Sequence, residues 1–134
     1  MTTDLRLFDI TLDASGDDTN NQFKAVFPTS SDANGEYAVV EVVGARFIGV
    51  LQDKSTAAGI ASNVRVAGIT KMQAGASSGM TAAIEEGDVV VASSLGQAVV
   101  STAAGTAKMG TALESLGTTS TGIIKVLLGV GLTT

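Results

Sequence analysis

The sequence contains no cysteine and no histidine, so the side chains that most often bind transition metals are missing. Without cysteine, neither disulfides nor thiolate ligands can form. Without histidine, a serine nucleophile would need a lysine base, and no local pattern supplies one. A lysine-linked carrier domain is also disfavoured, since Thr70 stands before Lys71 where that class of site carries methionine. These absences predict a protein that is not an enzyme and that holds no metal and no cofactor.

Aromatic side chains and positive charge are scarce as well. Tryptophan is absent and aromatic residues make up 4% of the chain, so a platform for stacking bases or sugars is not expected. A net charge of −5 argues against nucleic acid as a partner. The most apolar segment, residues 123–132, is about half as long as a membrane span, and no secretory signal precedes the first strand. We therefore expect a soluble protein, made in a cytoplasm, that binds neither nucleic acid nor membrane.

The chain has 134 residues, which suits one domain, and it is rich in small and β-branched residues. Residues 64–69 alternate between two faces, as a strand does. Short segments of this kind recur about every 8 to 12 residues between glycine-containing turns, a spacing typical of small barrels and sandwiches. The expected strands are residues 23–27, 37–43, 47–51, 64–69, 108–116 and 123–130, with a hairpin over residues 88–101. Pro28 is expected to end the first of these strands, because proline cannot continue a central ladder.

Residues 1–21 differ from the rest of the chain. Apolar residues of this segment alternate with Asp and Thr, and a loop rich in Asp, Asn and Gly follows. One interpretation is an ordinary first strand of the barrel. The other is an N-terminal arm that lies on a neighbouring subunit, since such arms are commonly ordered by a partner. We divide the chain into an arm, residues 1–21, and a β domain, residues 22–134.

The order and spacing of several short motifs resemble the capsid decoration proteins, or cement proteins, of tailed bacteriophages. The resemblance covers about residues 22–131 and is carried by the segments FKAV (23–26), IGVLQDK (48–54), VRVAGI (64–69), EGD (86–88), Gly96, GTALE (110–114) and IKVLL (124–128). It implies a compact all-β fold, a small β-barrel or β-tulip-like domain of short strands. It also implies a structural protein that binds the outer surface of the assembled capsid, with the major capsid protein as partner.

Members of that family often form trimers where capsomers meet, so a homotrimer or another homo-oligomer on the virion is expected. The function predicted here is stabilisation of the shell by cross-bridging major capsid protein subunits. The alternative is a host-surface or glycan-binding module displayed on the virion, which the scarcity of aromatic residues disfavours. The candidate capsid contacts in the arm, where related proteins can add a strand to a capsid sheet, are Leu5, Leu7, Phe8, Ile10 and Leu12. The candidate contacts in the exposed connection between strands are Gln52, Asp53 and Lys54.

Carboxylates offer little chemistry of their own. Glu85 and Glu86 are adjacent, and neighbours in an extended chain point to opposite faces, so they cannot share a substrate. The acidic segment around Asp13, Asp17 and Asp18 lacks the alternating spacing and the closing glutamate of a calcium loop. Both groups are expected to be solvated turn residues.

Overall fold

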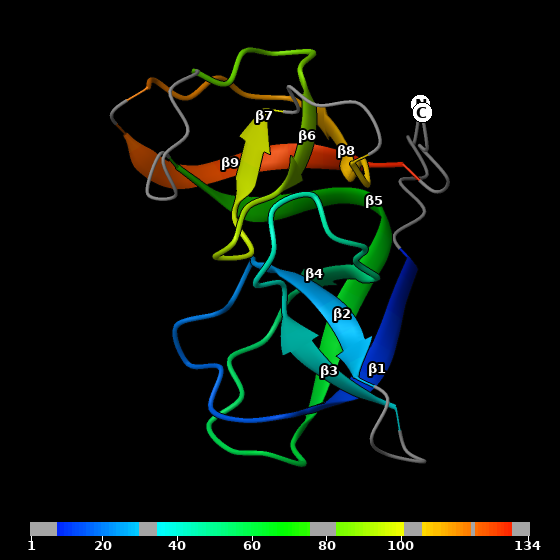
Figure 1. Ribbon diagram of the computed structural model, residues 1–134. Coiled ribbons are helices and arrows are strands. Elements are labelled where there is room, and N and C mark those ends of the chain that lie inside the picture. Colours follow the sequence, from blue (N-terminus) through cyan, green and yellow to red (C-terminus); the bar gives the residue numbers. More distant parts are fainter. Residues whose placement is uncertain (1–7, 30–34, 76–82, 101–105, 119, 130–134) are drawn as a thin grey trace, which may run out of the picture.

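The computed structural model describes residues 8–29, 35–75, 83–100, 106–118 and 120–129, and these contain strands and no helix (Figure 1). The strands are β1 (Phe8–Ala14), β2 (Ala25–Thr29), β3 (Glu36–Val39), β4 (Gly49–Leu51), β5 (Ala61–Gly75), β6 (Val89–Ala92), β7 (Ala98–Val100), β8 (Gly110–Ala112) and β9 (Thr121–Leu128). The prediction of a small all-β domain of short strands is confirmed. No helix in this described part is long and apolar enough to cross a membrane.

Strand β5 belongs to two rings of strands. Its first half pairs with β1 and β4, and its second half pairs with β9 and, at Ala74, with β7. Strands β3 and β2 complete the first ring, and β6 and β8 complete the second. Figure 1 shows the first ring below the second, with β5 running through both. The chain therefore forms two joined rings rather than one barrel.

Gly68 lies at the junction between the two rings, in the middle of β5. Ala67 pairs with β1, whereas Gly68 and Ile69 pair with β9. The φ angle of Gly68 is 95°, a conformation that glycine adopts without the steric cost of a side chain. Figure 1 shows that β5 bends strongly between the rings. The glycine in the predicted alternating segment is thus the position that lets one strand serve two rings.

Arg65 connects the two sides of this junction. Its guanidinium donates to both carboxylate oxygens of Asp9 in β1, with Nε and Nη2 at 2.8 and 3.0 Å. A third donor, Nη1, reaches the carbonyl of Ile69 at 3.2 Å, beyond the glycine. Such paired hydrogen bonds to a carboxylate fix both distance and angle. The side chain therefore holds β1 against the start of the second ring.

Apolar side chains fill both rings. The core residues of the first ring are Ala14, Val26, Tyr37, Leu51 and Val64. A larger cluster fills the second ring and also takes in residues from first-ring strands; its main members are Ala25, Val40, Val50, Met72, Val90, Met109, Ile124 and Val126. Because this cluster draws on both rings, the two rings pack as one body.

Two sequence-based expectations for the strands have clear outcomes. The predicted hairpin is confirmed, since β6 and β7 pair antiparallel across the turn that contains Gly96. The expected end at Pro28 is wrong, because β2 continues through Pro28 to Thr29 and pairs there with β3. Strand β4 pairs with β2 at Ala25 and Val26. The Val26 carbonyl accepts from the Ile48 amide, so the backbone polar groups of Val26 face the β4 side, and those of Pro28, two residues on, face the same side. Strand β4 does not reach Pro28, so its missing N–H costs no ladder bond.

Glycines also permit the closest approaches between strands, which gives a first prediction. A Cβ placed on Gly110 would lie 2.0 Å from the carbonyl oxygen of Leu127, which belongs to the backbone and cannot easily move. We expect Gly110→Ala to lower the melting temperature by roughly 5–10 °C, since overpacking against backbone costs about 1–3 kcal/mol. Circular dichroism during heating measures this.

Gly16→Ala is the control, because a Cβ on Gly16 meets no atom within 4 Å. Equal melting temperatures for Gly110→Ala and the native chain would contradict the close packing of β8 on β9.

Candidate binding surface

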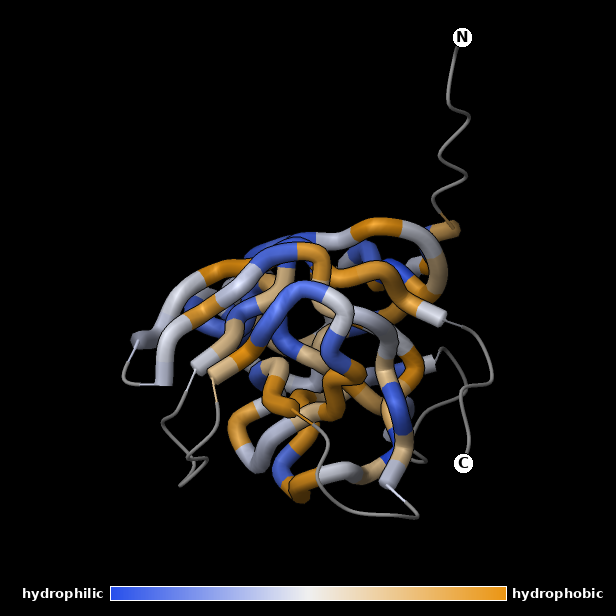
Figure 2. Tube along the Cα trace, turned by 90° about the horizontal axis from the view of Figure 1, so that it is seen from above, coloured by the Kyte–Doolittle hydropathy of each residue, from blue (hydrophilic) through white to orange (hydrophobic). Residues whose placement is uncertain are grey.

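The outward side of the second ring exposes a broad sheet surface, here called the β9 face. Residues directly opposite on neighbouring strands share a face, and the burial alternates strictly along β9, so the outward positions can be assigned. The β9 face consists of Ile69, Lys71, Gln73, Val89, Thr111, Leu113, Ile123, Lys125 and Leu127. Figure 2, which looks down from the side of the second ring, shows hydrophobic and hydrophilic residues interspersed along the chain.

Four cross-strand partners, three of them apolar, form a row across four strands of this face. Ile69, Leu127, Thr111 and Val89 are successive cross-strand partners from β5 to β6. Leu127 and Val89 are 45% and 41% exposed, and Ile123 at the other end of β9 is 53% exposed. Several exposed apolar side chains on one face are a feature of protein interaction sites.

Charged residues lie in the middle of the β9 face, between these apolar ends. Lys71 and Lys125 are directly opposite each other on β5 and β9, a position in which like charges repel. Glu114 forms an ion pair with Lys125, with Oε1 at 3.1 Å from the Lys125 ammonium nitrogen. Its other oxygen, Oε2, accepts a hydrogen bond from the Lys125 backbone amide at 2.9 Å. The hydrogen bonds from Lys125, with a smaller attraction from Lys71, hold the pKa of Glu114 below its ordinary value.

A hollow of about 260 Å³ adjoins the β9 face where the two rings meet. Its lining residues are Thr19, Asn20, Gln22, Phe23, Lys54, Gln73 and Ile123. Gln73 and Ile123 are also part of the β9 face, so the two features are continuous. Phe23 has a φ of 67°, an uncommon conformation for a residue with a side chain. Two backbone hydrogen bonds keep it there, from its amide to Leu51 and from the Gln73 amide to its carbonyl.

Glutamine side chains fix the loop that carries this hollow. Gln22 donates to the Gln52 carbonyl at 2.7 Å, and Gln52 in turn donates to Val50 and to the Thr70 hydroxyl, each at 2.9 Å. Gln73 donates to the Gln22 carbonyl at 2.8 Å. These bonds join the segment before β2 to β4 in the first ring and to the second half of β5 in the second ring. The hollow is therefore built on a fixed backbone.

The three residues predicted from the connecting loop have different surroundings. Gln52 is engaged in the hydrogen bonds just described, and Asp53 accepts from the Asn63 amide at 2.7 Å, which closes the loop. Lys54 is exposed and lines the hollow. Of the three, the structure brings Lys54 together with the β9 face. A role for any of them in binding stays a prediction.

The predicted arm residues divide in a similar way. Leu5 and Leu7 lie outside the described residues. Phe8, Ile10 and Leu12 belong to β1, which pairs with β5 in the first ring, as the interpretation of an ordinary first strand requires. Ile10 and Leu12 pack against the first-ring core, whereas Phe8 is 60% exposed. The boundary at residue 21 and capsid contact by these residues stay predictions.

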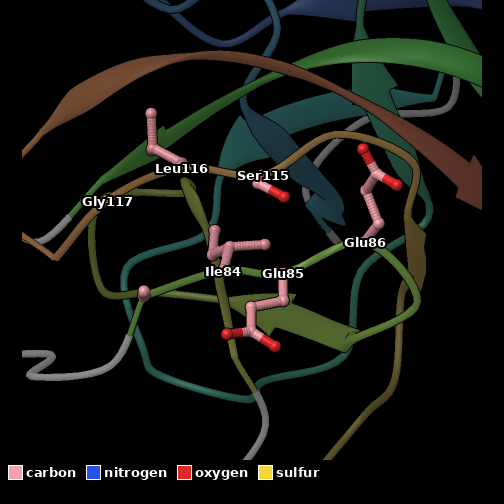
Figure 3. A pocket seen from close by; sticks show the side chains of 7 residues that line it. Ile84, Glu85, Glu86, Ser115, Leu116 and Gly117 are labelled. Atoms are coloured by element: carbon pink, nitrogen blue, oxygen red, sulfur yellow. The ribbon is translucent and has the colours of Figure 1, made fainter.

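Other acidic groups do not form a metal site in the described part of the chain, where no three Asp or Glu residues come close enough to hold an ion. Asp17 accepts from Thr19, and these hydrogen bonds lower the pKa of Asp17. A second hollow, of about 520 Å³, is lined partly by Glu85, Glu86 and Leu116. Figure 3 shows the two carboxylates pointing in different directions, so they do not converge on a shared ligand.

A second exposed apolar group lies on the loop between β3 and β4. Val42 and Val43 are 65% and 49% exposed. The next residue, Gly44, donates its amide to the Ala92 carbonyl at 2.8 Å and accepts from the Ala107 amide at 3.0 Å. These bonds hold the loop from the first ring against the second ring. The valines are thus presented on a supported turn, separate in the chain from the β9 face.

The described residues form an all-β body with exposed apolar surfaces. Residues 14–128 match the model of the phage cement protein family, and the chain belongs to that family. These are structural proteins associated with the bacteriophage capsid. No curated protein gives a significant sequence match.

A solved structure shares the fold. The chain superimposes on the N base of the head fiber protein gp8.5 in bacteriophage phi29 with a TM-score of 0.63. The match covers 92% of this chain and 95% of that one at 15% sequence identity. This likeness shows that the two chains share a fold.

The depressed pKa of Glu114 gives a second prediction. A carboxyl whose pKa is lower in the folded state contributes stability above its ordinary pKa, and loses that contribution as the pH falls through the folded value. Lys125→Gln removes the side-chain partner, so we expect the Glu114 pKa to rise toward its ordinary range. Carboxyl-carbon NMR titration measures the midpoint.

Lys24→Gln makes the same change in net charge away from Glu114 and should leave the midpoint where it is. An unchanged Glu114 midpoint in Lys125→Gln would show that the ion pair is not formed in solution.

Proposed function

We propose that this protein is a non-enzymatic virion component that binds the outer surface of the assembled bacteriophage capsid and cross-bridges major capsid protein subunits. Membership of the phage cement protein family carries the proposal. Exposed apolar residues on two segments support it further: Val89, Ile123 and Leu127 lie on the β9 face, and Val42 and Val43 lie on the β3–β4 loop. A cross-bridging protein needs two contact surfaces, and these segments offer them.

Cross-bridging stabilises a shell by mass action. A protein that binds neighbouring subunits only when they are assembled favours the assembled state in proportion to its binding free energy. Each contact can be modest, because a contact repeated over the lattice or made by an oligomer gains from high effective concentration. We therefore propose a homotrimer or another homo-oligomer on the capsid exterior, made in the host cytoplasm before it joins the virion.

The described residues do not support the glycan-binding alternative. Sugar sites usually present aromatic rings to solvent, but the single tyrosine, Tyr37, is buried. Phe23, Phe27 and Phe47 pack against the core, which leaves Phe8 as the exposed ring of the described chain. A lone phenylalanine does not make a stacking platform.

The test is sedimentation with empty, expanded capsids from which endogenous cement protein has been removed. The purified protein at micromolar concentration should pellet with the capsids and should raise the temperature at which they disassemble. If the protein stays in the supernatant, the capsid-binding proposal is wrong. If it pellets without raising the disassembly temperature, cross-bridging is wrong although binding is right.

A matched pair of variants locates the surface in the same assay. Leu127 on the β9 face and Leu95 in the β6–β7 turn are 45% and 44% exposed, so each can be changed to serine at similar cost to the fold. We expect Leu127→Ser to weaken capsid binding about tenfold, which corresponds to about 1.4 kcal/mol, and Leu95→Ser to leave it unchanged. Equal binding by both variants would exclude the β9 face as the contact.

A further inference from the structure

Positively charged side chains lie on and beside the β9 face of this acidic protein. The chain has 8 Lys and Arg against 13 Asp and Glu. Three of the lysines nonetheless lie on this surface: Lys71 and Lys125 on the face, and Lys54 in the adjoining hollow. Among the described residues, Glu114 is the carboxylate that forms an ion pair with one of these lysines. The lysines on this surface therefore outnumber the carboxylates paired with them.

The geometry of the lysine pair leaves one positive charge without a close anion. Lys71 and Lys125 repel each other across the strand pair, and Glu114 is hydrogen-bonded to Lys125 through both of its oxygens. Within the described residues, neither Lys71 nor Lys54 has a carboxylate within salt-bridge distance. A carboxylate from a partner would relieve the repulsion and complete the neutralisation. Charged residues without a close partner on a binding surface affect which protein binds and how fast it associates.

We propose that the β9 face recognises a protein surface that carries carboxylates among apolar side chains, and that Glu114 competes with those carboxylates for the lysines. This proposal rests on the proposed function, which makes that partner surface part of the capsid exterior. Ile69, Leu127 and Val89 would cover apolar residues of the partner on one side of the lysines, and Ile123 on the other. The central lysines would then be shielded from water, where their attraction to carboxylates is stronger.

A protein partner suits these features better than a nucleic acid does. A polyphosphate approaching this chain meets a net charge of −5, which opposes association at long range. Nucleic-acid surfaces also depend on many phosphate contacts, usually with arginine. The β9 face has lysines set within an apolar surface and no arginine among its described members. Isolated carboxylates on a partly apolar protein surface match that arrangement.

The experiment measures capsid affinity by sedimentation for two opposed variants. The Lys71→Gln/Lys125→Gln double variant should bind about tenfold more weakly and with less dependence on salt, since surface charge pairs act partly through association. Glu114→Gln keeps an acceptor for the Lys125 amide but removes the competing charge, so it should bind about two- to fivefold more tightly. Melting curves confirm that each variant is folded.

Glu36→Gln is the matched control for net charge, since Glu36 accepts from Thr29 in the first ring and glutamine can do the same. It should leave capsid affinity unchanged. If the native protein binds capsids and all these variants bind equally, charge recognition by the β9 face is wrong while the capsid-binding proposal stands. If the native protein does not bind capsids at all, the capsid-binding proposal and the charge-recognition proposal are both wrong. Labelled duplex DNA is the last probe: lysine-dependent binding at micromolar concentration would make the partner a nucleic acid and overturn the proposal.

Discussion

Strand β5 is the constraint on which the rest of the molecule depends, because it is the strand that both rings share. Each ring closes only if β5 supplies an edge to partners on both sides, first to β1 and β4 and then to β9 and β7. The change of partners happens at Gly68, where φ is positive. Arg65 then holds Asp9 of the first ring and the Ile69 carbonyl of the second with one guanidinium. A failure at this junction would disturb the strand that both rings share.

The β9 face follows directly from that arrangement. Strand β9 pairs with the whole second half of β5, from Gly68 to Gly75, and this long pairing supports the surface on both strands. The hollow beside it exists because hydrogen bonds of Gln22, Gln52 and Gln73 join the segment before β2 to the second half of β5. Surfaces held in place before binding lose less conformational entropy when a partner arrives. A protein that must reinforce a rigid shell benefits from such rigidity.

Much of the architecture could be predicted from local patterns in the sequence. The alternation at residues 64–69 and the valine-rich hairpin both indicate strands, and both are strands in the structure. What could not be predicted is which strands pair, because a period of two marks the face of a residue and not its partner. The pairing of β1 with β5 joins residues 48 to 59 positions apart, and the placement of Lys54 beside Ile123 joins residues 69 positions apart. Gln52, Asp53 and Lys54 look alike in sequence as an exposed loop, yet long-range hydrogen bonds engage Gln52 and leave Lys54 exposed.

The central claim is that one copy of this protein joins two or more subunits of a phage capsid through surfaces that include the β9 face. The most direct measurement is a cryo-electron microscopy reconstruction of expanded capsids decorated with the full chain, at a resolution that shows side chains. We expect the density of each copy to contact at least two capsid subunits, with Leu127 and Lys125 facing the shell. Copies that each touch a single subunit, or that turn the β9 face toward solvent, would contradict it.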